Sequence, residues 1–212
     1  VENTRLGLDA GETLSLIGGD IAIHGSGTGG DTLRLPSGRL NLVAVASPGE
    51  VTLDDSRVDP QMRVDSFAQL GKIEVTGGAR IVYAGDPGGT AVIRADSLLL
   101  DRSSFDGTTS GETDHPGVSA DLGVRGQIDI LGEAGEFAWV DSTTLGAGRG
   151  GSIKVRAGSL RIEHLVPGAT RRGGLLSHSQ GGDPGDIVVR VGQLWITGRG
   201  AAISSTRPRS GR

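Results

Sequence analysis

The sequence predicts an all-β chain folded as a parallel β-helix, a solenoid in which short strands stack coil upon coil. A gapless pattern recurs at residues 89–100, 151–162 and 185–196, and each copy begins with glycine. Apolar and polar residues alternate along each copy, which is typical of half-buried strands. Glycine supplies 38 of the 212 residues and aromatic residues only 3%. This composition suits glycine corners around a narrow aliphatic interior.

Each copy is expected to form a strand, a one- or two-residue corner and a second strand. In the second copy, Ile153 and Val155 point to one face, while Lys154 and Arg156 point to the other. After the corner, Leu160 returns to the first face. Both strands of a copy therefore contribute to the same interior.

Weaker copies extend the pattern along the chain. The expected first inward residues are, in chain order, Ile21, Leu40, Ile73, Ala91, Ile128, Ile153 and Ile187. A third short strand often follows, as at residues 175–179 and 201–205. Three strands per turn predict about seven or eight coils, with loop excursions of variable length between them.

Three segments depart from the alternation. Residues 59–70 suit a short helix, with Asp59 as N-cap, Pro60 in the first turn and Gly71 as the stop, but an extended excursion fits them equally well. The polar stretches 101–125 and 166–174 are expected to be loops that leave the rod.

Composition excludes several classes of function. The chain has no cysteine, which rules out disulfides, a thiolate nucleophile and cysteine-based metal sites. No apolar run approaches the ~18 residues of a membrane span, and residues 1–8 lack the features of a signal peptide. A net charge of −4 gives no basic footprint for nucleic acid. We therefore expect neither nucleic-acid binding nor membrane insertion.

The runs 14–23, 35–42 and 48–53 resemble the later part of the haemagglutination-activity (secretion) domain of filamentous haemagglutinin-like exoproteins of two-partner secretion. The repeat best seen at residues 150–162 resembles the coils that follow this domain, and similar chains are often labelled S-layer-like surface proteins. The resemblance divides one continuous β-helix into residues 1–53, from the end of the secretion domain, and repeat coils at 54–212. The Asn-Pro-Asn-type motif near the start of that domain is absent, so we expect a piece of a longer protein.

The resemblance implies a right-handed β-helix that is secreted or displayed on a bacterial cell surface. It implies a non-catalytic adhesin or a structural rod or fibre. The implied partners are the outer-membrane transporter of the two-partner system and an acidic glycan or another host or cell-surface ligand.

The alignment of the copies also predicts a candidate binding surface. Arg94, Arg156 and Arg190 take the same outward position, and Arg156 and Arg190 are expected in adjacent coils. Like charges about 5 Å apart repel, so they need solvent, a neighbouring carboxylate or an anionic ligand. A solvated face is the simpler interpretation. Trp195 also points outward and could contact a partner or be covered by a loop.

The alternative function is that of a polysaccharide lyase or hydrolase, because parallel β-helices also include such enzymes. Hydrolysis of a glycosidic bond needs two nearby carboxylates. Candidate groups form two clusters: Asp54, Asp55, Asp59 and Asp65; and Glu112, Asp114 and His115. Both are expected in solvated excursions, where free carboxylates are normal. We therefore assign no catalytic residue.

No metal or cofactor is expected either. Residues 26–34 resemble one calcium-binding nonapeptide with Asp31 as its carboxylate, but such sites need consecutive copies, and an ordinary turn is preferred. The glycine motifs at 25–30 and 146–151 do not open a helix, as a dinucleotide fingerprint must. No histidine has the spacing of a zinc ligand pair.

The two ends of such a stack predict a further kind of contact. A stack of coils cut at both ends exposes backbone edges, which can pair with another copy. Head-to-tail self-association into a fibre is one outcome, and capping by flanking segments is the alternative.

Overall fold

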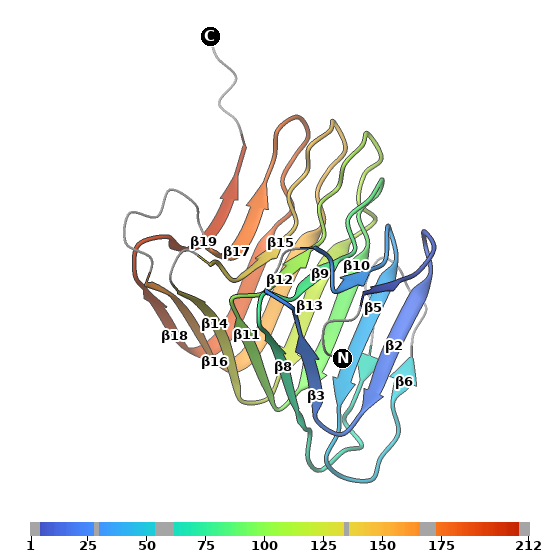
Figure 1. Ribbon diagram of the computed structural model, residues 1–212, viewed down its shortest axis with the longest axis vertical. Coiled ribbons are helices and arrows are strands. Elements are labelled where there is room, and N and C mark those ends of the chain that lie inside the picture. The colour runs from blue at the N-terminus through green and yellow to red at the C-terminus, as the bar shows by residue number, and fades with distance from the viewer. Residues whose placement is uncertain (1–4, 28–29, 54–61, 134–135, 166–172, 208–212) are drawn as a thin grey trace.

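The computed structural model describes residues 5–27, 30–53, 62–133, 136–165 and 173–207 of the chain (Figure 1). The described residues form strands and loops without a helix, and so offer no helix able to cross a membrane. Nearly all strand pairs are parallel, which confirms the all-β, parallel prediction. The pairs fall into three ladders, in which each strand lies beside its counterpart from earlier and later in the chain.

The first ladder contains β2 (Thr13–Gly18), β5 (Arg39–Ala44), β10 (Thr90–Ala95), β13 (Val118–Val124) and the first halves of β16 (Ser152–Leu165) and β18 (Ile187–Thr197). The second contains β3 (Ile21–His24), β8 (Lys72–Thr76), β11 (Ser97–Asp101), β14 (Gln127–Glu133) and the second halves of β16 and β18. Because β16 and β18 run through both ladders, these two ladders form one folded sheet.

The third ladder forms a separate sheet. It contains β1 (Leu6–Gly7), β4 (Leu33–Arg34), β9 (Arg80–Val82), β12 (Ser104–Asp106), β15 (Trp139–Asp141), β17 (Gly173–His178) and β19 (Ala201–Thr206). An additional antiparallel pair joins β6 (Thr52–Leu53) to β7 (Met62–Arg63).

The core lies between the ladders and is built from rows of aliphatic side chains. In the first ladder Leu40, Ala91, Ala120 and Ile153 occupy consecutive paired positions and are fully buried. Comparable rows in the other two ladders face them across the interior. Alternation along each strand therefore buries one face, as the sequence predicts.

The strongest repeats pair as the sequence alignment predicts. Ile153 pairs with Ile187 and Leu160 pairs with Leu194, so residues 151–162 and 185–196 lie side by side in register. The expected third strands at 175–179 and 201–205 are confirmed as β17 and β19. The ladders also run across the expected boundary after residue 53, because β5 pairs with β10.

The weaker copy at Leu40 lies in the expected row, but the assignment of three other weaker copies was wrong. Ile21, Ile73 and Ile128 lie in the second ladder, in the row of Leu98 and Leu160, rather than opposite Ile153. Strands of both ladders follow a glycine or a turn and carry the same alternating pattern. Periodicity alone therefore could not assign a strand to its ladder.

The prediction that residues 101–125 leave the rod as a loop was also wrong. Strands β12 and β13 lie within this stretch, and β13 pairs with β10 on one side and β16 on the other. Its polar residues Ser119 and Asp121 are buried, so polarity did not mark exposure here.

Two further segments depart from regular strands. Among the described residues, 62–70 contain β7 followed by turns, which agrees with an extended excursion and not a helix. Asp59 and Pro60 lie outside the described residues. Met62, Val64, Phe67 and Leu70 of this segment pack against Val43 and Val92 on the outward face of the first ladder. Of the expected loop 166–174, only Gly173 and Gly174 are described, and they begin β17.

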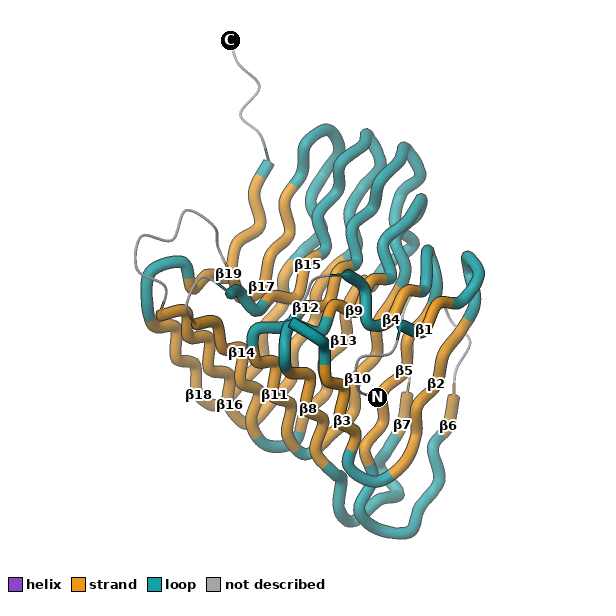
Figure 2. The backbone as a smooth tube through the Cα atoms, viewed as in Figure 1, coloured by secondary structure: helices purple, strands orange, loops and turns teal. Residues whose placement is uncertain are grey.

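The loops that follow the third ladder stack on one another (Figure 2). Isolated parallel bridges join Gly85 to Thr109, Thr109 to Thr144 and Thr144 to Ser179. At Gly146 an added Cβ would lie 2.0 Å from the carbonyl oxygen of Gly111. Close approach of backbones in these loops therefore accounts for part of the glycine content.

Candidate arginine groove

A groove of about 580 Å³ lies between residues 62–70 and the outward face of the first ladder, and we call it the arginine groove. Its charged lining consists of Arg63, Asp65, Arg94, Arg125, Arg156 and Arg190. Asp121 lies beneath this lining and pairs with two of the arginines. Five guanidinium groups therefore face two carboxylates, which gives the groove a positive potential in a chain of net negative charge.

The ladder places three of these arginines in one row. Arg94 pairs with Gly123, Gly123 with Arg156, and Arg156 with Arg190. The expected common position is therefore confirmed, and so is the adjacency of Arg156 and Arg190. Between Arg94 and Arg156 the row has a glycine, where an added Cβ would lie 3.0 Å from Nη1 of Arg94. The missing side chain thus leaves room for the Arg94 guanidinium.

Arg94 differs from the sequence expectation because its side chain is buried instead of facing solvent. Nη2 donates to Oδ2 of Asp121 at 2.6 Å, and Nη1 donates to the carbonyl oxygens of Ile93 and Asp121. Nε donates to the carbonyl oxygen of Met62 at 3.0 Å. Arg94 therefore joins the excursion to the ladder and has a structural role at the base of the groove.

Asp121 supplies the neighbouring carboxylate that stacked arginines require. It is only 3% exposed, and its Oδ1 also accepts a hydrogen bond from Nη2 of Arg156 at 2.9 Å. One buried carboxylate thus bridges a buried and a half-exposed guanidinium. Asp121 was not predicted as a site residue, because it lies in the stretch 101–125 that the sequence indicated as a loop. The alternation of residues 118–124 was the available signal.

Arg125 fixes the other side of the excursion. Its guanidinium donates to the carbonyl oxygens of Val64, Phe67 and Ala68, at 3.3, 2.8 and 3.0 Å. These bonds satisfy turn carbonyls and leave the charge without a carboxylate partner among the described residues. Arg125 therefore shapes the groove and adds to its positive potential.

Arg63 and Arg190 provide the accessible cations of the groove. Both are exposed, and neither forms an ion pair or side-chain hydrogen bond within the described part of the chain. Arg190 lies one strand from Arg156, a separation of about 4.8 Å in a sheet. An anionic group placed between these two side chains would relieve their repulsion.

Trp195 lies outside the groove. It is 47% exposed on β18 and pairs with Arg161, in the second ladder. Its neighbours Leu194 and Ile196 are exposed to a similar degree. The structure therefore separates Trp195 from the arginines with which the sequence analysis grouped it.

The carboxylate clusters considered for hydrolysis do not assemble into a paired site among the described residues. Asp54, Asp55 and Asp59 lie outside those residues, and Asp65 lines the arginine groove. Oδ1 of Asp114 accepts the backbone N–H of Arg149 at 2.7 Å, and Glu112 is exposed. Asp114 is thus used to join two stacked loops.

His115 is buried, contrary to its expected place in a solvated loop. Nε2 donates to the carbonyl oxygen of Gly89 at 2.8 Å, while Nδ1 accepts the N–H of Gly117 at 3.1 Å. Burial lowers the pKa of His115, so the ring is neutral near pH 7. Both nitrogens are engaged, which leaves the ring a structural role.

The candidate calcium ligand Asp31 pairs with cations. Its carboxylate contacts Arg34 at 2.9 Å and Arg80 at 3.5 Å, so its charge is already compensated. In the described ranges no group of three or more His, Asp or Glu side chains has an arrangement suited to a metal ion. The glycine motif at 146–151 lies in a loop before β16, as the sequence predicts.

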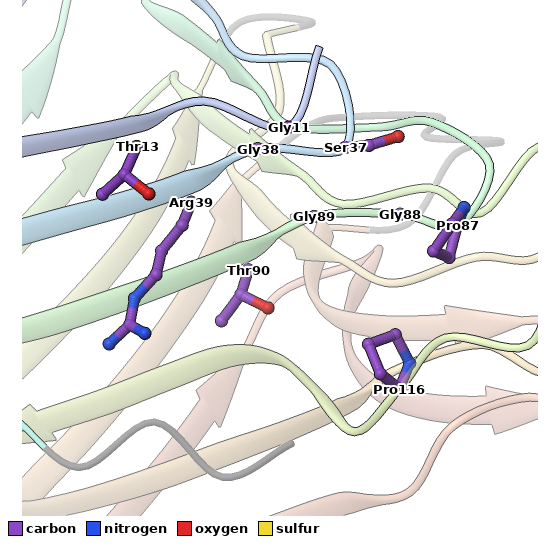
Figure 3. Close-up of a pocket in the computed structure, with 10 residues that line it drawn as sticks. All are labelled: Gly11, Thr13, Ser37, Gly38, Arg39, Pro87, Gly88, Gly89, Thr90 and Pro116. Atoms are coloured by element: carbon purple, nitrogen blue, oxygen red, sulfur yellow. The ribbon is translucent and has the colours of Figure 1, made fainter. Parts of the chain in front are cut away.

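A smaller pocket of about 310 Å³ lies at the start of β2, β5 and β10 (Figure 3). Thr13, Arg39 and Thr90 extend from these three neighbouring strands, and Pro87 and Pro116 border the opposite side. Nε of Arg39 donates to Oδ1 of Asn41 at 3.0 Å. With one cation and a wall of glycines and prolines, this pocket has less capacity for charged ligands than the arginine groove.

Comparison with known proteins gave no match, whether to protein-family models, curated proteins or solved structures.

Proposed function

We propose that the chain is a non-catalytic segment of a secreted bacterial surface protein, and that it serves as an adhesive or structural rod. In this proposal the fold is a right-handed parallel β-helix of about seven or eight coils, like that of filamentous haemagglutinin-like exoproteins. Export through an outer-membrane transporter of the two-partner type belongs to the same proposal.

The order in which the chain visits the ladders supports a helical path. β10, β11 and β12 belong to the first, second and third ladders, and β13 begins the first ladder again. The same order recurs with β13, β14 and β15. Repetition of one coil, each paired in parallel with the next, is the pattern of a solenoid.

The arginine groove is the observation that carries the adhesive function. Arg156 and Arg190 present adjacent positive charges on a rigid sheet, and Arg63 lies on the opposite excursion. Guanidinium groups bind carboxylates and sulfates through paired, charge-assisted hydrogen bonds. An acidic glycan therefore fits this groove better than a neutral one, and its binding requires no covalent step.

The first test is co-sedimentation of the purified chain with insoluble acidic and neutral polysaccharides, with and without calcium. The same samples are assayed for new reducing or unsaturated ends. We expect retention on the acidic polymers alone, independent of calcium and without new ends. Appearance of new ends would instead support the polysaccharide lyase or hydrolase alternative, and absence of any retention would contradict the adhesive function.

A further inference from the structure

His164 is buried without a hydrogen-bond partner for either ring nitrogen. Its side chain is fully buried, and within the described residues neither Nδ1 nor Nε2 has a partner. His115, which is also buried, engages both of its nitrogens. Buried polar atoms without partners are rare in folded proteins because they lose their contacts with water and gain nothing in return.

The ring of His164 lies in the corner between the second and third ladders. His164 pairs with Gly132 of β14 and follows the inward-facing Ile162 by two residues, so the alternation along β16 turns its ring into the core. The ring stacks on that of Phe137, with 5.9 Å between the ring centroids. A titratable group therefore occupies a position that belongs to the aliphatic rows.

Glycines on two neighbouring strands leave the space that the ring fills. A Cβ added at Gly132 of β14 would overlap Nδ1 and Cε1 of His164. A Cβ added at Gly173 of β17 would overlap Cε1 and Nε2. The imidazole is therefore enclosed by backbone from both ladders.

One backbone acceptor faces the same small space and is already in use. The Cβ added at Gly173 would lie 2.7 Å from the carbonyl oxygen of Ala138, which accepts the N–H of Gly174 at 2.9 Å. This hydrogen bond joins the start of β17 to the residue before β15. A ring N–H that turned toward Ala138 would compete for the bond.

We propose that His164 is an acid-sensitive latch: when its ring takes up a proton, the corner around it opens locally while β1 to β9 stay paired. We call this region the His164 corner and define it as residues 130–133, 137–141, 162–165 and 173–176. The inference does not depend on any ligand of the arginine groove.

A proton on His164 creates a charge that nothing in the corner compensates. Charged side chains on the elements packed around the ring are Arg102, Glu133, Glu136, Asp141, Arg161, Glu163 and Arg199. Within the described residues, none of them forms an ion pair or a hydrogen bond with the ring. Because a buried, unpaired charge is strongly disfavoured, the imidazolium favours an open state in which water reaches the ring.

The direction of titration agrees with this geometry. Burial lowers the pKa of His164, and the carbonyl oxygen of Ala138 acts in the opposite direction. The closed corner therefore holds a neutral ring near pH 7, whereas the open corner restores the ordinary pKa of about 6.5. Since the open state binds the proton more tightly, the latch is closed above that pH and is released as the pH falls below it.

The test is hydrogen exchange of the full chain at pH 7.5 and pH 5.0, corrected for the intrinsic exchange rate. We expect opening of the His164 corner, monitored at the amide of Gly174 and along β15 and β17, to become about tenfold more frequent at pH 5.0. Exchange along β9 should change less than about twofold. An unchanged corner, or an equal increase along the whole chain, would overturn the inference.

Two variants identify the ring as the cause. His164→Leu fills the position with an aliphatic group, and His164→Gln fills it with an uncharged polar group. Either variant should abolish the pH dependence of exchange in the corner. His115→Gln removes a different buried histidine, which lies against Gly151 before the opposite end of β16, and should retain that dependence.

Circular dichroism at pH 7.5 establishes that each variant is folded, and an NMR titration of the wild type measures the pKa of His164 directly. We expect that pKa to lie well below about 6.5. A pKa at or above this value would overturn the inference even if neither His164 variant folds. A folded His164 variant whose corner still opens at pH 5.0 would overturn it as well.

Discussion

Asp121 illustrates how one buried side chain sets the character of the arginine groove. Its carboxylate contacts Arg94 at 2.6 Å and Arg156 at 2.9 Å. Nε of Arg94 in turn donates a hydrogen bond to the carbonyl oxygen of Met62. The ion pair inside the groove therefore also determines where the excursion lies.

We predict that Asp121→Asn destabilises the fold by about 3 kcal/mol or more, because the substitution leaves the buried charge of Arg94 uncompensated. Asp96→Asn, at an exposed corner, should change the free energy of unfolding by no more than about 0.5 kcal/mol. Denaturant unfolding of both variants measures the difference. Equal stability of the two would contradict the role given to Asp121.

Two buried histidines predict a pH dependence of stability. Burial lowers the pKa of His115 and of His164, whose ring stacks on Phe137. In the unfolded chain both pKa values return to about 6.5. Below that pH the unfolded state binds more protons, so stability is highest above it and is lost as the pH falls.

The expected loss is about 1 to 2 kcal/mol per pH unit between pH 6.5 and 5, measured by denaturant unfolding. His115→Gln should reduce this slope, because the variant has one fewer group whose pKa is lowered by burial. A slope that is the same in the wild type and in this variant would show that other groups govern the pH dependence.

At the scale of the elements, the stacked loops depend on glycine as strictly as the strands depend on aliphatic rows. Gly146 approaches Gly111 so closely that a side chain has no room. Gly18, at the end of β2, has nothing within 4 Å of an added Cβ.

We predict that Gly146→Ala destabilises the chain by about 1 to 3 kcal/mol, since the loop backbone must shift to accept the methyl group. Gly18→Ala should be neutral or stabilising by up to about 1 kcal/mol, because it restricts the unfolded chain without a clash. Thermal unfolding of the pair gives the comparison. A stable Gly146→Ala variant would show that the loops are less tightly stacked.

The alternation of apolar and polar residues predicted where the strands lie better than it predicted which strands pair with one another. It predicted β10, β16 and β18 with the correct register. It could not distinguish the first ladder from the second, because both bury every other residue. It also missed β13, whose buried Asp121 is stable only through the Arg94 and Arg156 side chains of other strands.

The arginine groove was likewise predictable only in part from the sequence. Repeat alignment placed Arg156 and Arg190 side by side, which the ladder confirms. Arg63 and Arg125 could not be foreseen, because their place in the groove depends on how the excursion folds back over the sheet.

At the scale of the whole molecule, parallel pairing joins the strands into one rigid scaffold, although the register shifts between β13 and β16. β16 illustrates this, since it pairs with β13, β14 and β18 along its length. A surface fixed on such a stack, including the arginine groove, loses little conformational freedom on binding. This combination of a rigid scaffold and a charged groove is the basis of the proposed adhesive function.

The most direct test of this function is titration calorimetry with one defined sulfated oligosaccharide, comparing the wild type with Arg190→Ala and Arg199→Ala. Both variants lose one exposed positive charge, but only Arg190 lines the groove. We predict that Arg190→Ala weakens binding about tenfold or more, as expected for a lost charge-assisted contact, and that Arg199→Ala changes the affinity less than about twofold. Equal weakening by both variants would mean that net charge, and not the arginine groove, attracts the ligand, and would contradict the proposal.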